Sequence, residues 1–277
     1  MIKKNILNNA VLSCKNHREL DKKTIKKFIP GYKLMENAGE VIYKIIKQKF
    51  KKQKKIKILC GPGNNGGDGF VVAKLLKENG YKNIDLFCLV TKRELKGDAR
   101  VAADNFNENF KSFTDFQTSN NDVIIDGLFG SGLKKNISGN LKKIIEKINL
   151  KKPYCVSIDI PSGINGDTGE IQGVALKSND TITFTRKKPG HLLSPGSEYC
   201  GNVIVEDIGI NLEKLLFKPQ IFENHPDNWK SKFPWPNQKS HKYTRGFSLI
   251  ICGEKMTGAS RLAARGAARI GCGLLCL

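Results

Sequence analysis

The sequence predicts a fold of the α/β class, in which a mainly parallel central sheet is covered by helices on both faces. Short apolar runs alternate with helix-like segments over most of the chain. The 277 residues are enough to bury a sizeable core. Glycine-rich loops follow several of the apolar runs, as they do where parallel strands lead into helices and a ligand binds beyond the strand ends.

The first part of the chain is predicted to be helical. Residues 13–29 are typical of a polar helix with Ser13 as its N-cap. Residues 31–50 follow, with apolar side chains at helical spacing that fall on one face. These side chains are Leu34, Ala38, Val41, Ile42, Ile45, Ile46 and Phe50.

Strands and helices then alternate, which predicts a Rossmann-like three-layer sandwich with a mainly parallel central sheet. The helices are expected at residues 66–79, 94–110 and 141–148. The strands are expected at residues 55–60, 83–90, 122–129, 154–163 (ending in a Pro-Gly turn), 181–185 and 202–210.

The composition changes near residue 220. Residues 222–241 contain three of the ten prolines and both tryptophans, and they show no periodicity, which is typical of a linker. A strand, an Ala-rich helix and the beginning of another strand follow. We therefore expect a first domain at 1–221, a linker at 222–240 and the incomplete start of a second α/β domain at 241–277.

The composition argues against several classes of protein. The net charge of +21 is carried mostly by lysines spread along the chain, without the aromatic and arginine pattern of nucleic-acid binding. The eight cysteines include no CxxC pair, which indicates a reduced protein without a disulfide framework or a zinc site. No apolar run approaches the roughly 20 residues of a membrane span. We expect a cytoplasmic protein with no membrane or nucleic-acid partner.

Three loops each combine glycines with acidic residues: GPGNNGGDG (61–69), DGLFGSGLKKN (126–136) and DIPSGING (159–166). Glycine lets backbone N–H groups approach a phosphate closely, and a following helix N-terminus favours negative charge. The first loop is neither a Walker A motif nor GxGxxG in the dinucleotide register. A tight structural turn is the alternative for any one loop. Three such loops at the ends of successive parallel strands favour a nucleotide site.

Five motifs, in order over roughly residues 10–215, resemble the NAD(P)H-hydrate epimerase family. They are LMENAG (34–39), GPGNNGGDG (61–69), DGLFGSGL (126–133), SIDIPSGINGDTG (157–169) and KPGHLLSPGSEYCG (188–201). The tail, with HKYTRG and GEKMTGASRLAARGAARIGCGL, resembles the start of the ribokinase-like NAD(P)H-hydrate dehydratase domain, which follows the epimerase in bifunctional repair enzymes. We expect no dehydratase activity, because the catalytic segments of that domain lie further along such chains.

The resemblance implies a metabolite-repair isomerase that interconverts the R and S forms of NADH or NADPH hydrated at C6 of the nicotinamide ring. It also implies a homodimer that needs one potassium ion per subunit, held by Asn65, Asp126 and Ser162, and no redox cofactor. The implied substrate-binding residues are Asn64, Asn65, Gly66, Gly67, Asp68, Gly130, Ser131, Gly132, Leu133, Lys134, Lys135, Asn136 and Asp159.

Asp159 is the predicted catalytic residue. One carboxyl group could first help the C6 hydroxyl to leave, giving a ring iminium, and then act as base for the returning water. To act as an acid near neutral pH, this carboxyl would need a pKa raised by burial. No chemistry is assigned to the four histidines.

Structural alternatives stay open for several of these residues. Asp126 could cap the following turn, and Ser162 could be a turn residue. Lys134 and Lys135 could be solvated rather than bound to phosphate. For the whole chain, the alternatives are a non-catalytic nucleotide- or RNA-binding scaffold of the same fold and a small-molecule kinase of the ribokinase type. The acid of the third loop and the asparagines of the first argue against a scaffold, and the absence of a late anion-hole glycine motif argues against a kinase.

Overall fold

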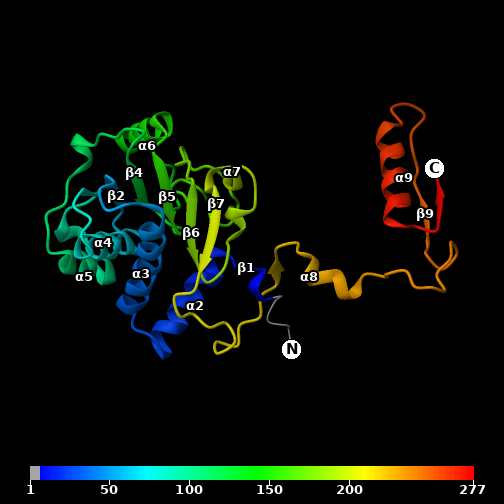
Figure 1. Ribbon diagram of the computed structural model, residues 1–277, viewed down its shortest axis with the longest axis horizontal. Helices are drawn as coiled ribbons and strands as arrows, with labels where there is room; N and C mark the ends of the chain where they lie inside the picture. Colours follow the sequence, from blue (N-terminus) through cyan, green and yellow to red (C-terminus); the bar gives the residue numbers. More distant parts are fainter. Residues whose placement is uncertain (1–6) are drawn as a thin grey trace. The chain divides into compact units, whose positions relative to one another are not determined.

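The computed structural model describes residues 7–277 (Figure 1), which form two compact units, the first ending at Asn224 and the second comprising His225–Leu277. The first unit contains a six-stranded sheet in the order β3-β2-β4-β5-β6-β7, and all of its neighbouring strands are parallel. The strands are β2 (Ile56–Cys60), β3 (Ile84–Cys88), β4 (Val123–Gly127), β5 (Tyr154–Ile158), β6 (Asp180–Phe184) and β7 (Asn202–Glu206).

Helices surround this sheet, and the predicted α/β class is confirmed. Ser13 caps the first helix as expected, since its side chain accepts a hydrogen bond from the Asn16 N–H at 3.2 Å. A short antiparallel pair, β1 (Ala10–Val11) with β8 (Ile221–Phe222), was not predicted. The helices are α2 (Cys14–Lys27), α3 (Gly31–Lys49), α4 (Asn64–Glu78), α5 (Gly97–Phe106), α6 (Gly139–Lys151) and α7 (Gly196–Cys200).

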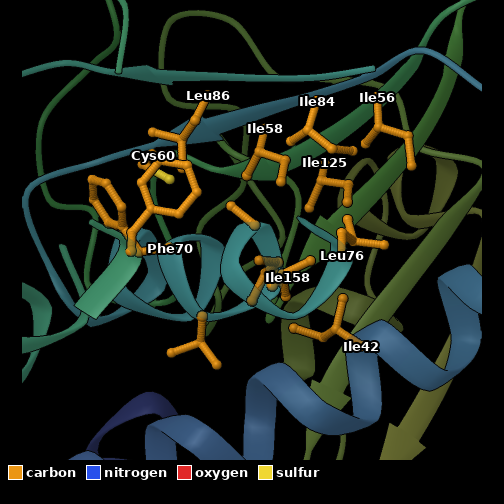
Figure 2. Packing of buried hydrophobic residues seen from close by; sticks show 14 of the residues in the cluster. Ile42, Ile56, Ile58, Cys60, Phe70, Leu76, Ile84, Leu86, Ile125 and Ile158 are labelled. Carbon is orange, nitrogen blue, oxygen red and sulfur yellow. The ribbon is translucent and has the colours of Figure 1, made fainter. Parts of the chain in front are cut away.

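Two apolar layers cover the two faces of the sheet, because parallel strands between helices are buried on both sides. Figure 2 shows one of them, in which Phe70 and Leu76 of α4 pack against Ile58 and Ile125 of the sheet. The other layer contains Ile124, Leu59 and the buried face of α6. Successive residues of β4 therefore enter opposite layers, which explains why Val123, Ile124 and Ile125 are all apolar.

The sheet order places the first two glycine loops side by side. The chain passes from β2 to β3 on one side and returns to β4 on the other, so the carboxyl ends of β2 and β4 form the topological switch point where open α/β sheets bind ligands. The Gly61 N–H donates to the Gly127 carbonyl at 2.9 Å. Helix α4 begins at Asn64, two residues before the predicted start, so the asparagines of the first loop belong to its first turn.

The second unit consists of α8 (Pro226–Trp229), the parallel strands β9 (Phe247–Leu249) and β10 (Leu274–Cys276), and α9 (Gly258–Ile270) between them. This confirms the predicted strand, helix and strand. The expected linker is not wholly irregular, because it contains α8 and the end of β8. Among residues 7–277, no helix has the length and apolar character needed to cross a membrane.

Candidate active site

A cavity of about 870 Å³ lies at the carboxyl edge of the sheet. Its walls come from α2 and α3, from the loops after β2 and β4, and from the ends of β5 and β6. The fold thus brings most of the predicted substrate-binding residues to one space. Those on the cavity wall are Asn64, Asn65, Asp68, Gly130, Ser131, Gly132, Leu133, Lys134, Lys135, Asn136 and Asp159.

Gly66 and Gly67 do not line the cavity. A Cβ atom at Gly66 would lie 1.9 Å from the Gly61 carbonyl oxygen, and one at Gly67 would lie 2.5 Å from the Met35 methyl carbon. The structure therefore explains both glycines by the close packing of α4 on its surroundings, and their contact with substrate stays a prediction. Asp126 and Ser162 also lie behind the wall, fully buried.

Asp159 is held rigidly where β5 ends. Its φ of 68° lies in the left-handed region, which residues other than glycine rarely occupy and which is found at functional sites. Its N–H donates to the Ile182 carbonyl of the neighbouring strand at 2.7 Å. One side-chain oxygen, Oδ2, accepts the Ser131 N–H at 2.9 Å, and the other, Oδ1, accepts from the Lys188 ammonium at 2.5 Å. The carboxylate thus joins the loop after β4 to the segment after β6.

The pKa of Asp159 is opposite to the one that a role as a general acid requires. Burial favours a raised pKa, but the adjacent Lys188 ammonium and the Ser131 N–H outweigh it and hold the pKa of this carboxyl well below its usual range. The raised pKa that a role as an acid would require is therefore not observed, because a buried cation lies beside the carboxylate. Asp159 is therefore ionised at neutral pH, which suits a base or a counter-ion rather than an acid.

Lys188 and His191 support Asp159 from the segment after β6. The Lys188 ammonium also donates to Thr183 Oγ1 at 3.1 Å. His191 Nδ1 accepts the Lys188 N–H at 2.9 Å, so its other ring nitrogen carries the proton and donates to the Asp159 carbonyl at 2.8 Å. Burial and the Lys188 charge lower the pKa of His191 to about 4, which keeps its ring neutral. Sequence reasoning assigned neither residue a role, although both lie in the KPGH motif just beyond a predicted strand.

Asp126 and Ser162 form hydrogen bonds with one another behind the cavity wall. Ser162 Oγ donates to Asp126 Oδ1 at 2.6 Å, and the Ser162 N–H donates to Oδ2 at 2.8 Å. Asp126 also accepts the Leu128 N–H at 3.2 Å, so the alternative that it caps the following turn is realised too. Burial raises the pKa of Asp126, and its hydrogen bonds offset part of that rise.

These residues fit a weakly bound hard cation. Within residues 7–277, no lysine, arginine or histidine forms an ion pair with Asp126, and its carboxylate has only neutral partners. Asn65, in the first turn of α4, lies on the cavity wall and has a side-chain amide oxygen. Carboxylate, hydroxyl and amide oxygens are ligands for such an ion. The described residues contain no group of three or more His, Cys, Asp or Glu side chains, the usual ligands of a tightly bound metal ion.

The family follows from a comparison with known proteins. A family model described as YjeF-related protein N-terminus matches residues 31–190, which are more than half of the chain. The chain belongs to this family. Its matched segment contains Asp68, Asp126, Asp159 and Lys188, whereas α2 precedes it.

Two relatives of known name match different parts of the chain. The NAD(P)H-hydrate epimerase of Lentilactobacillus buchneri is 38% identical over 217 residues, which are 77% of this chain and 98% of that protein. The bifunctional NAD(P)H-hydrate repair enzyme Nnr of Coxiella burnetii is 37% identical over 265 residues, or 93% of this chain and 54% of the relative. The chain thus spans about half the length of the bifunctional relatives that it matches.

A solved structure shows the same fold. The crystal structure of the yeast protein YNL200c has a TM-score of 0.62 and 24% sequence identity, and the match covers 77% of this chain and 96% of that one.

Helix α2, which precedes the matched YjeF-related segment, adds His17, Arg18 and Asp21 to the cavity wall. Burial lowers the pKa of His17 to about 3 and raises the pKa of Asp21 to about 6. Sequence reasoning missed this wall, because helical periodicity alone does not show which face meets a cavity.

Proposed function

We propose that this protein interconverts the R and S forms of hydrated NADH or NADPH by epimerisation at C6 of the nicotinamide ring. The observation that carries the proposal is the ionised Asp159 carboxylate on the wall of a large cavity, at the end of β5 and bonded to the glycine loop after β4. The names of relatives that match nearly their whole length, such as the Lentilactobacillus buchneri epimerase, support the same reaction.

Two regions of the cavity suit the pyrophosphate and the nicotinamide ring of such a substrate. The N-terminus of α4 at Asn64 presents unpaired backbone N–H groups and the positive end of a helix dipole, which suit a pyrophosphate. Lys134 and Lys135 are exposed in the loop that forms part of the wall and add positive charge. Asp159 would face the nicotinamide ring, where its negative charge stabilises the iminium that forms when the C6 hydroxyl leaves.

We also propose a potassium ion at the site. Asn65, Asp126 and Ser162 would hold it through their side-chain oxygens, as the oxygen donors of these residues and the unpaired charge of Asp126 favour. Bound there, the ion would supply a fixed positive charge that orders the loops after β2 and β4 around the substrate.

The experiment is to measure how fast the separated epimers of hydrated NADPH interconvert with the wild-type protein and with Asp159→Asn. We expect the wild type to accelerate interconversion and the variant to lose at least about a hundredfold, the scale of general acid–base catalysis. Nucleotide binding and the melting temperature should change little in comparison. A fully active Asp159→Asn protein would contradict the role of Asp159, and an inactive wild type would contradict the proposed reaction.

A further inference from the structure

A buried ammonium group in a cavity wall needs an explanation. The Lys188 side chain is 2% exposed and belongs to the wall of the cavity that contains Asp159. Burying an ion pair is expensive, and replacing such a pair by well-packed apolar side chains often leaves a protein as stable or more stable. Stability therefore does not by itself explain why a lysine and an aspartate meet here, on the surface that a ligand would touch.

The proposed reaction, on which this inference rests, requires a proton donor that Asp159 does not provide. The C6 hydroxyl leaves easily only as water, whereas Asp159 is held ionised by its neighbours. The imidazoles of His17 and His191 are neutral at this site, because burial lowers the pKa of each. Two carboxyl groups with raised pKa values, those of Asp21 and Asp68, also face the cavity.

Lys188 is the donor in direct contact with the group that faces the ring. Its ammonium has three N–H bonds, of which two point to Asp159 Oδ1 and Thr183 Oγ1. The third N–H is not used in either contact. These two contacts position the ammonium before substrate arrives, and the Lys188 N–H donates to His191 Nδ1. We propose that Lys188 is the catalytic proton donor to the leaving C6 hydroxyl, with Asp159 as the counter-ion of the ring cation.

The step balances without any other reactant. A proton passes from Lys188 Nζ to the hydroxyl oxygen, the C6–O bond breaks, and water leaves. The lone pair of the ring nitrogen N1 forms the N1=C6 bond, so the ring is positive and Lys188 is neutral. Water then forms a C–O bond on the opposite face of C6, the π electrons return to N1, and the proton lost by that water passes to Asp159 and on to Lys188.

Two substitutions separate proton donation from positive charge. Lys188→Arg keeps a cation beside Asp159, but a guanidinium does not release its proton at neutral pH. Lys188→Ala removes both functions and leaves space for a small amine. Lys187→Ala is the matched control, because Lys187 does not line the cavity and pairs with Glu223 at 2.9 Å.

The assay is epimer interconversion of hydrated NADPH, with uptake of isotopically labelled water oxygen at C6 as a second readout of hydroxyl loss. We expect Lys188→Arg and Lys188→Ala to lose at least about a hundredfold in kcat with KM changed far less, while Lys187→Ala stays at the wild-type rate. Added methylammonium should restore part of the Lys188→Ala activity, and tetramethylammonium, which carries no transferable proton, should not.

Several results would overturn the assignment. A fully active Lys188→Arg protein would show that charge alone is needed, as would equal rescue by tetramethylammonium. If Asp21→Asn or Asp68→Asn abolishes labelled-oxygen uptake while Lys188→Arg retains it, the donor is that carboxyl. If Lys188→Ala does not fold, Lys188→Arg still decides the question. An inactive wild type would instead refute the proposed function, which keeps the two failures distinct.

Discussion

The contact between the loops after β2 and β4 leads to a sharp prediction for Gly61→Ala. A Cβ atom at Gly61 would lie 1.7 Å from the Leu128 carbonyl oxygen and 2.8 Å from its carbonyl carbon, against an optimal separation of about 3.5–4 Å between carbon atoms. The obstacle is backbone, so it cannot rotate away like a side chain. The loops can separate only by stretching the bond between the Gly61 N–H and the Gly127 carbonyl.

The loss of stability has two sources, the overpacking at Leu128 and the stretched hydrogen bond to Gly127. Overpacking costs about 1–3 kcal/mol, and a lost backbone hydrogen bond adds about 1 kcal/mol. In a folded unit of this size each kcal/mol lowers the melting temperature by about 2–4 °C. We therefore expect Gly61→Ala to melt about 5–15 °C below the wild type, and to lose epimerase activity because the loops that would bind the phosphates move apart.

Gly63→Ala, in the same loop, is the matched control. Nothing lies within 4 Å of a Cβ atom at this position, and its φ of −100° and ψ of −168° are open to any residue. Replacing Gly63 by alanine loses stability, because alanine is a poorer N-cap residue, and gains stability, because the unfolded chain becomes less flexible. These two effects nearly cancel. Thermal melting by circular dichroism should leave Gly63→Ala close to the wild type. If Gly61→Ala melted with the wild type as well, the two loops would not be in the contact described here.

Three further predictions concern the buried histidine, the ion and the second unit. Because burial lowers the pKa of His17 to about 3, below about pH 6.5 the unfolded chain takes up a proton that the folded protein does not. Stability should then fall with decreasing pH by up to about 1.4 kcal/mol per pH unit, and urea unfolding of His17→Gln should show a shallower pH dependence; an unchanged slope would contradict this. Potassium should raise the wild-type melting temperature relative to tetramethylammonium, and Asp126→Asn should remove most of that difference; equal wild-type midpoints in the two salts would argue against the ion. A chain ending at Asn224 should keep epimerase activity and aggregate less, because it lacks exposed apolar side chains such as Ile251 and Leu262; lost activity would place part of the site in the second unit.

The sequence by itself determined the class of the fold and the segments that carry chemistry. Adjacent apolar residues in a short strand, such as Val123, Ile124 and Ile125, can be buried on both faces only in a sheet covered by helices on both sides, and this arrangement is observed. The glycine loops were equally visible, since loops that approach a ligand or another backbone closely, as Gly61 does, need residues without a side chain. These are local properties, so reading along the chain is enough to find them.

Tertiary structure decided how those segments act together. Local periodicity contains no information on strand order, so only the fold shows that the ends of β2 and β4 are neighbours and that α2 closes the cavity. The protonation state of Asp159 was likewise beyond the sequence, because it depends on a cation 29 residues away that reaches it only once β5 and β6 pair. A pKa is set by charges and burial in space, and these exist only after the chain has folded.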